Sequence, residues 1–224
     1  MPSVEPKSEI PAIYRYFKDP ISGLTHLLGA GLGVFGLYYL VSSSGKASFP
    51  QVISFIVFSI SLILLYLASS AYHLLHVSIR ARKVLRQIDH SMIYVFIAGT
   101  YTPFCIIPLS GKFGTGILVS VWIFAGVGVI LKLVWEAPRW LSTAIYVLMG
   151  WIVLVALLPL YRTVSPSGFC WLVAGGVAYM VGSLVYSLKK PNPFPPHFGF
   201  HEIWHLFVLL GSFCQFMSVA GLVS

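Results

Sequence analysis

The residues best suited to chemistry are histidines and carboxylates at the ends of apolar segments. His73 closes one segment, Asp89 opens the next, and His201 and His205 open the last. Residues four positions apart share one helical face, so the imidazoles of His201 and His205 can bind one metal ion. Imidazole and carboxylate ligands suit tetrahedral zinc. We therefore predict a zinc site at which His73, Asp89, His201 and His205 converge. The alternative is two interfacial histidines that hydrogen-bond to neighbouring helices.

Three further residues are site candidates, each with two interpretations. Ser69 lies one turn before His73, where it can orient a metal-bound water or bond back to its own helix. Glu202 completes a His-Glu-x-x-His motif, in which the glutamate acts as a general base. It can also be a carboxylate at the N-terminus of a helix, where the helix dipole favours a negative charge, and we prefer this interpretation. His26 follows Thr25 at the start of the first apolar segment, as a support for the metal ligands or a substrate contact.

The elements that must position these residues are membrane-spanning helices. The chain of 224 residues is 58% hydrophobic and 9% charged, with a mean hydropathy of +0.88, whereas a soluble domain carries about 25% charged residues. Each apolar run is close to the length that crosses a bilayer as a helix. We therefore predict an all-α, seven-helix membrane bundle. The expected spans are Ile21–Val41, Val52–His73, Ile88–Leu109, Thr115–Val134, Ser142–Leu160, Phe169–Leu188 and Glu202–Val223.

The basic residues predict the orientation of this bundle. The N-terminal segment and the even loops hold eleven: Lys7, Arg15, Lys18, Arg80, Arg82, Lys83, Arg86, Lys132, Arg139, Lys189 and Lys190. The odd loops hold three: Lys46, Lys112 and Arg162. Cytoplasmic loops carry the excess of Lys and Arg, so the N-terminus is expected inside and the C-terminus outside. The predicted organisation is a short cytoplasmic segment, residues 1–20, and a transmembrane domain, residues 21–224.

Other features of the sequence exclude several classes of protein. The net charge of +8 comes from short clusters between apolar runs, which is typical of membrane proteins and argues against a nucleic-acid partner. The three cysteines lie far apart, so neither a disulfide framework nor a cysteine metal site is expected. The run Gly29-Ala30-Gly31-Leu32-Gly33 lies inside an apolar span, where it indicates close helix packing and no dinucleotide site.

Taken together, these motifs resemble the hemolysin III family, the bacterial branch of the progestin and adipoQ receptor group. The resemblance extends from Asp19 to Leu222. It rests on Thr25-His26, on Ser69-x-x-x-His73, on the run Ile88-Asp89-His90-Ser91-Met92-Ile93-Tyr94 through Ala98-Gly99-Thr100-Tyr101-Thr102-Pro103-Phe104, and on His201-x-x-x-His205 with Trp204.

The resemblance implies a seven-helix bundle with one zinc near the cytoplasmic side of a cell membrane, in bacteria the inner membrane. The family's zinc ligands fall on His73, His201 and His205, its aspartate on Asp89 and its serine on Ser69. Two positions depart from the pattern. Glu202 stands where animal receptors of the group carry glutamine, and Gln215 stands where many bacterial relatives carry histidine.

The group also resembles alkaline ceramidases, which favours a zinc-dependent hydrolase for a lipid amide or ester in membrane lipid homeostasis. A sphingolipid-like or fatty-acyl lipid is then the expected partner. Zinc lowers the pKa of a bound water toward about 7; Asp89 would take its proton, and Ser69 could stabilise the oxyanion. The alternatives are a lipid or membrane-state sensor with structural zinc, a membrane-lytic hemolysin, and a transporter. Three protein ligands plus a water favour catalysis over a closed structural site.

Overall fold

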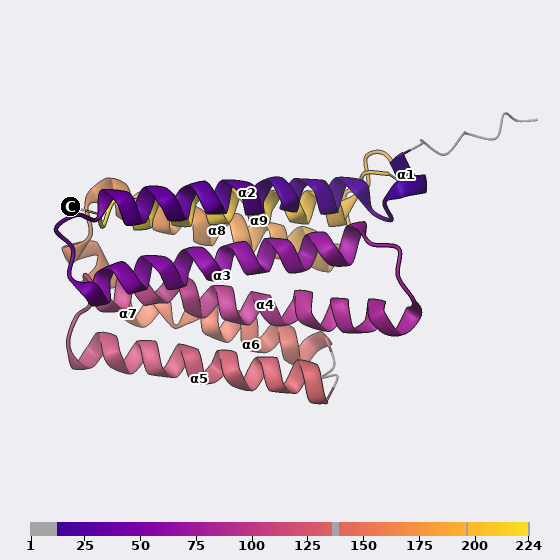
Figure 1. The fold of residues 1–224 in the computed structure, drawn as a ribbon. Coiled ribbons are helices and arrows are strands. Elements are labelled where there is room, and N and C mark those ends of the chain that lie inside the picture. The colour runs from indigo at the N-terminus through magenta and orange to yellow at the C-terminus, as the bar shows by residue number, and fades with distance from the viewer. Residues whose placement is uncertain (1–12, 136–138, 196, 224) are drawn as a thin grey trace, which may run out of the picture.

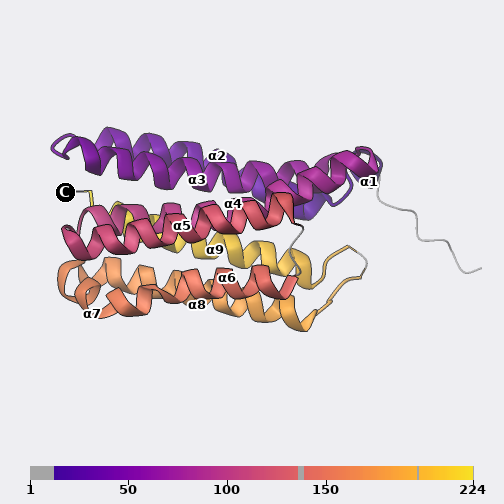
Figure 2. The ribbon, with the colours of Figure 1, turned by 90° about the horizontal axis from the view of Figure 1, so that it is seen from below.

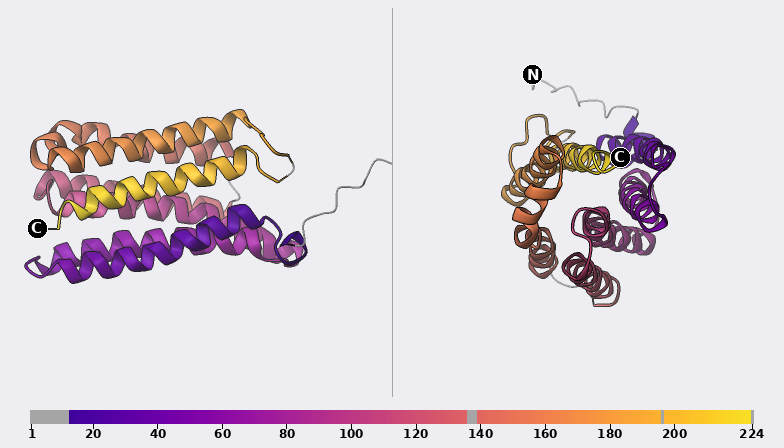
Figure 3. Two further views of the ribbon diagram at one scale, coloured as in Figure 1. Left: turned by 90° about the horizontal axis from the view of Figure 1, so that it is seen from above. Right: turned by 90° about the vertical axis from the view of Figure 1, so that its left-hand side faces the viewer.

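The computed structural model describes residues 13–135, 139–195 and 197–223, and these form an elongated helical bundle (Figure 1). Its helices are α1 (Ile13–Tyr16), α2 (Pro20–Ser43), α3 (Phe49–Leu74), α4 (Ile79–Ile106), α5 (Lys112–Val134), α6 (Arg139–Trp151), α7 (Val153–Thr163), α8 (Pro166–Leu188) and α9 (Phe200–Ala220). Seen from below, α9 lies between the α2–α3 pair and the α6–α8 group (Figure 2). Helices that follow one another in the chain pack side by side, and α9 closes the bundle against both α8 and α2 (Figure 3).

Six helical segments of the described residues are long and apolar enough to cross a membrane. They confirm six of the seven expected spans. The remaining one, Ile88–Leu109, lies mostly in α4, which has 28 residues and ends at Ile106 but is not among the six. The span contains Asp89 and His90 near its start, which lower its hydropathy. Helix α4 packs against α3, α5, α6 and α9. Because those neighbours shield α4 from lipid, it can carry polar residues that a lipid-facing helix could not. The count of seven spans stays a prediction.

The fifth expected span, Ser142–Leu160, is built from two helices instead of one. Helix α6 ends at Trp151 and α7 begins at Val153. At the break, the hydroxyl of Tyr101 donates to the carbonyl oxygens of Met149, at 2.7 Å, and Gly150, at 3.1 Å. These carbonyls would otherwise need partners from the next helical turn, so a side chain of α4 stabilises the interruption.

The glycine-rich face of α2 explains how closely its neighbours approach. A Cβ on Gly29 would lie 2.8 Å from Cδ2 of Leu209 and 3.0 Å from Cε2 of Tyr66, and a Cβ on Gly33 would lie 3.0 Å from Ile63. Gly31, on the other face, has nothing within 4 Å of its Cβ position. Close packing of the Gly-x-x-x-Gly kind is therefore confirmed for Gly29 and Gly33.

One end of the bundle gathers the chemically interesting segments. The start of α2, the end of α3, the first turns of α4 and the start of α9 all lie at the end where α1 lies, and the last turn of α9 lies at the opposite end (Figure 1). Residues more than 100 positions apart in the sequence therefore meet at one depth.

Candidate metal centre

The candidate metal centre lies where α3 ends and α9 begins. His73 lies in the last turn of α3, while His201 and His205 lie in the first two turns of α9. Their four-residue spacing places both imidazoles of α9 on one face, toward His73. His73 and His205 are each only 3% exposed, and His201 is half-buried.

The three histidines, hereafter the His triad, point one nitrogen each at a common point. Nε2 of His201 lies 3.4 Å from Nε2 of His73 and 3.2 Å from Nε2 of His205. One ring nitrogen from each residue lies within 4.8 Å of the others. Nitrogens that bind a tetrahedral zinc at its usual bond length are about 3.3 Å apart. The residues therefore fit a zinc ion, which would be held through Nε2 of each histidine.

Asp19 supports this triad and was missed by the sequence reasoning. Its Oδ2 accepts from Nδ1 of His73 at 3.1 Å, and its backbone N–H donates to the His73 carbonyl at 2.9 Å. A carboxylate on the far nitrogen fixes the tautomer and orientation of a ligating imidazole. The available signal was an aspartate directly before Pro20, which indicates a helix N-cap. Asp19 nevertheless makes no capping hydrogen bond through its side chain, because that side chain is engaged with His73.

The charge of Asp19 is maintained by its neighbours. Burial by itself would raise the pKa of this carboxyl, but hydrogen bonds from His73 and Lys18 and the charges of both lower the pKa to about 2. Lys18 Nζ lies 2.5 Å from Oδ2 of Asp19. Asp19 is therefore ionised at neutral pH and presents a full negative charge to His73.

Glu202 joins the starts of α2 and α9. Its Oε2 accepts from the backbone N–H of Gly199 at 2.9 Å, and its Oε1 accepts from the Ser22 hydroxyl at 3.1 Å. Both oxygens are thus engaged in holding the first turn of α9, the helix-terminus role that the sequence favoured over a general base.

Asp89 adjoins the triad without joining it. Among the described residues, the group within ligand distance comprises the three histidines alone. The Asp89 carboxylate interacts with the Ser69 hydroxyl and with the charge of His73, and Nδ1 of His90 lies 3.9 Å away. Ser69 is 3% exposed. The structure therefore places the predicted aspartate and serine together beside the triad, and direct ligation by Asp89 stays a prediction.

His26 packs against the back of the triad. Its ring centroid lies 4.1 Å from that of His205 and 4.9 Å from that of Tyr66, and the residue is only 3% exposed. Neither of its ring nitrogens forms a hydrogen bond of normal geometry within the described residues. His26 thus brings α2 into contact with His205, although α2 contributes no member of the His triad.

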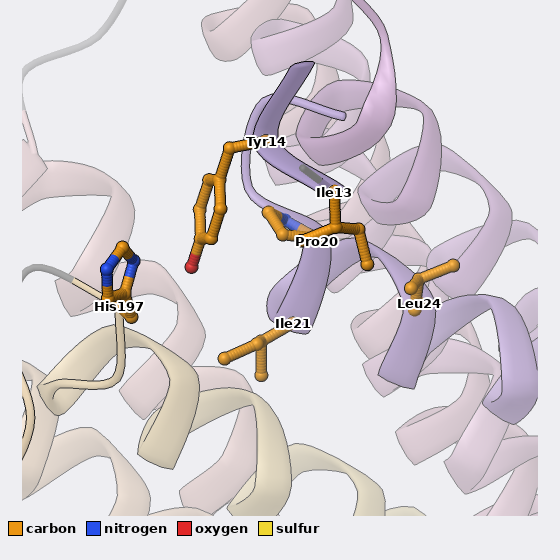
Figure 4. Close-up of a pocket in the computed structure, with 6 residues that line it drawn as sticks. All are labelled: Ile13, Tyr14, Pro20, Ile21, Leu24 and His197. Atoms are coloured by element: carbon orange, nitrogen blue, oxygen red, sulfur yellow. The ribbon is translucent and has the colours of Figure 1, made fainter. Parts of the chain in front are cut away.

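Two pockets open at this end of the bundle. One reaches the triad directly and is lined by Asp19, Asn192, Pro195, Gly199, Phe200, His201 and Glu202. The other is apolar, lies between the start of α2 and the segment that holds His197, and is lined by Ile13, Tyr14, Pro20, Ile21, Leu24 and His197 (Figure 4). The triad therefore has a polar mouth toward the end of the bundle, with an apolar surface close to it.

Comparisons with known proteins agree with this architecture. A family model described as "Haemolysin-III related" matches residues 14–216. The "Hemolysin-3 homolog" of Bacillus subtilis (strain 168) is 40% identical over 201 residues, covering 88% of this chain and 91% of the relative. "Hemolysin-3" of Bacillus cereus is 40% identical over 211 residues, covering 92% of each chain.

A more distant relative is the "Adiponectin receptor protein" of Drosophila melanogaster, which is 25% identical over 232 residues, covering 93% of this chain and 51% of that protein. The family match includes every residue of the His triad, together with Asp19, Ser69 and Asp89. The chain is a multi-pass membrane protein that belongs to the haemolysin-III related family.

Proposed function

We propose that this protein is a zinc-dependent hydrolase of membrane lipids that cleaves an amide or ester bond at the metal centre. The observation that carries the proposal is the convergence of three Nε2 atoms beside a separate, partly buried carboxylate, that of Asp89. Three imidazoles leave a fourth position open, which is the arrangement of catalytic zinc sites.

Zinc bound here would supply Lewis-acid polarisation of a carbonyl and a lowered pKa for an attacking water. The protein's own residues would do the rest. The His triad binds through Nε2, and Asp19 holds the imidazole of His73 in the tautomer that presents Nε2. The Asp89 carboxylate would receive a proton from the attacking water and deliver it to the leaving nitrogen or oxygen. The Ser69 hydroxyl, next to that carboxylate, would keep it in position or donate to the developing oxyanion.

The location of the centre favours a lipid substrate. The triad belongs to helices long and apolar enough to cross a bilayer, and it lies at their ends. A scissile bond between a polar headgroup and a fatty-acyl chain lies at that depth in a membrane. The polar mouth lined by Asp19, Asn192 and Glu202 could receive a headgroup. A sphingolipid-like or other fatty-acyl lipid is the substrate class that fits.

The experiment is turnover by purified, zinc-loaded protein of a lipid amide and a matched lipid ester, with release of free fatty acid as the readout. We expect activity that is lost on chelation and restored by zinc. The matched pair of variants is His205→Ala, at the triad, and His76→Ala, an exposed histidine at the same end of the bundle. No fatty acid release from any lipid amide or ester by zinc-loaded protein would end the hydrolase proposal.

A non-catalytic sensor is the second candidate, and the similarity to a protein named adiponectin receptor favours it. In that case zinc would only stabilise the bundle, so its removal would lower the melting temperature while wild-type protein shows no turnover. A membrane-lytic activity, which the names of the Bacillus relatives suggest, is tested separately by dye release from vesicles. Lysis by the wild type that persists in His205→Ala would separate that activity from the metal centre.

A further inference from the structure

A row of polar side chains runs from the His triad into the interior of the bundle. It consists of His26 on α2, Tyr66 on α3, Tyr179 on α8, and Ser212 and Gln215 on α9, hereafter the interior polar track. His26 and Gln215 are 3% and 5% exposed. From His205 to Gln215 the track extends ten positions along α9, about 15 Å. It therefore leads from the metal centre toward the middle of the bundle.

Four of the five members of the track contact one another across four helices. The His26 ring lies 4.1 Å from that of His205 and 4.9 Å from that of Tyr66. The Tyr66 hydroxyl bonds to the Ser212 hydroxyl, which itself donates to the Val208 carbonyl at 2.7 Å. Tyr179 interacts electrostatically with Tyr66 and Ser212. The track is therefore continuous from α2 to α8.

Several polar atoms of the track have unused hydrogen-bonding capacity. Within the described residues, no hydrogen bond of normal geometry is formed by either ring nitrogen of His26, by the Tyr179 hydroxyl or by Oε1 of Gln215, and the same holds for Nδ1 of the adjoining triad residue His205. Buried polar atoms nearly always have a partner, either from the protein or from ordered water. A buried water typically makes about three hydrogen bonds to such groups, and the track offers both donors and acceptors.

Glycines make room for these polar side chains between α8 and α9. A Cβ on Gly211 would lie 2.6 Å from Cε1 of Tyr179, and a Cβ on Gly175 would lie 2.6 Å from Nε2 of Gln215. Tyr179 and Gln215 thus occupy space that any larger residue would take away. Their burial is accommodated by the sequences of both helices and does not result from loose packing.

We propose that the interior polar track binds a row of water molecules, which connects the metal centre with the middle of the bundle. This water route is separate from the polar mouth beside His201 and does not depend on the hydrolase proposal. It gives the back of the triad hydrogen-bonding partners. It also gives water access to the triad from the membrane-embedded side, whatever reaction the centre performs.

The proposal is tested by X-ray radiolytic footprinting of the purified, zinc-loaded protein, because hydroxyl radicals generated from bound water label the nearest side chains. We expect Tyr66 and Tyr179 to be labelled severalfold faster than Tyr94. Tyr94 is a matched control: it is 1% exposed, packs on Tyr146 at a ring-centroid distance of 4.3 Å and lies outside the track. The modified tyrosines should contain oxygen-18 after equilibration in labelled water. Labelling of all three tyrosines at the same slow rate would overturn the proposal.

A variant provides an independent measurement. If the Tyr179 hydroxyl binds water, Tyr179→Phe should lower labelling of Tyr66 without raising the melting temperature. A melting temperature that rises in Tyr179→Phe would mean that the hydroxyl is buried without a partner, against the proposal. Fast labelling without oxygen-18, together with a co-purifying hydroxyl-bearing lipid, would assign the track to the lipid and also contradict bound water. Zinc content, measured in parallel, shows whether the variant protein is folded at the metal centre.

Discussion

At the scale of single residues, the carboxylate of Asp19 determines how His73 is presented. It accepts from Nδ1 at 3.1 Å, carries a full charge at neutral pH, and leaves Nε2 directed at the other two histidines. In Asp19→Asn the side chain keeps its shape and loses its charge. We expect zinc affinity to fall about 10- to 100-fold, the usual effect of removing such a partner.

Competition with a chelator of known affinity measures this change. Glu202→Gln is the matched control, because it removes a charge from the same mouth. The Glu202 carboxylate bonds to Ser22 and Gly199 and to no imidazole of the triad. Asp19→Asn protein with the affinity of the wild type would show that the hydrogen bond to His73 is incidental to metal binding.

A variant of Asp89 distinguishes a role in proton transfer from a role as a metal ligand. It lies outside the three-histidine group, so Asp89→Asn should retain most of its zinc. An amide cannot accept the proton of the attacking water, and we therefore expect lipid turnover to fall roughly 10²–10⁴-fold, the usual size of a general-base contribution. Zinc content and fatty acid release are measured on the same preparation. Loss of zinc in proportion to activity would instead make Asp89 a ligand, and unchanged turnover would remove it from the mechanism.

At the scale of elements, the first two turns of α9 supply two of the three histidines of the proposed zinc site. His201→Ala or His205→Ala should each lose most of the bound zinc, because two remaining imidazoles bind weakly. Purified wild-type protein should contain about one zinc per chain by elemental analysis. The exposed His76→Ala variant should match the wild type. A double variant of His201 and His205 that retains full zinc would place the metal elsewhere.

The break between α6 and α7 gives a second prediction at this scale. The Tyr101 hydroxyl bonds to the carbonyls of Met149 and Gly150, which have lost helical partners there. Tyr101→Phe leaves these groups short of a donor, so we expect a loss of about 1 kcal/mol in unfolding free energy, with zinc content unchanged. Unfolding in detergent by denaturant titration measures the loss. A variant as stable as the wild type would show that the break is maintained by its neighbours alone.

At the scale of the whole molecule, the two ends of the bundle differ in charge. Among the residues whose side chains the structure describes, the end with α1 and the His triad holds nine basic residues: Arg15, Lys18, Arg80, Arg82, Lys83, Arg86, Lys132, Lys189 and Lys190. The opposite end holds three: Lys46, Lys112 and Arg162. The excess of basic residues favours the cytoplasm for the triad end. A reporter enzyme that is active only outside the cytoplasm should therefore be active when fused after Ser224. A reporter that is active only in the cytoplasm should be active when inserted between His76 and Arg80. The reverse pattern would contradict the orientation and with it the cytoplasmic location of the metal centre.

The sequence alone was enough to predict the class of protein and the three histidines that come together at one end of the bundle. Long apolar runs with few charges can be stable only in lipid, where the helix satisfies its own backbone, and six of the expected spans are helices of suitable length and hydropathy. The spacing of His201 and His205 is a local property of one helix, so their shared face could be predicted from it. His73 joined them because its span end falls at the same depth.

The tertiary structure decided what depends on contacts between helices. No periodicity shows that Asp19 reaches His73 across 54 positions, or that Glu202 bonds to Ser22 across 180 positions. The polarity of α4 could be interpreted only when its neighbours showed that it is shielded from lipid. At the break at Ile152, a hydroxyl from another helix bonds to the C-terminal end of α6. Apolar patterning determines that helices form and insert into the membrane. The partners of individual polar atoms depend instead on which helices pack together, and hydropathy does not encode that choice.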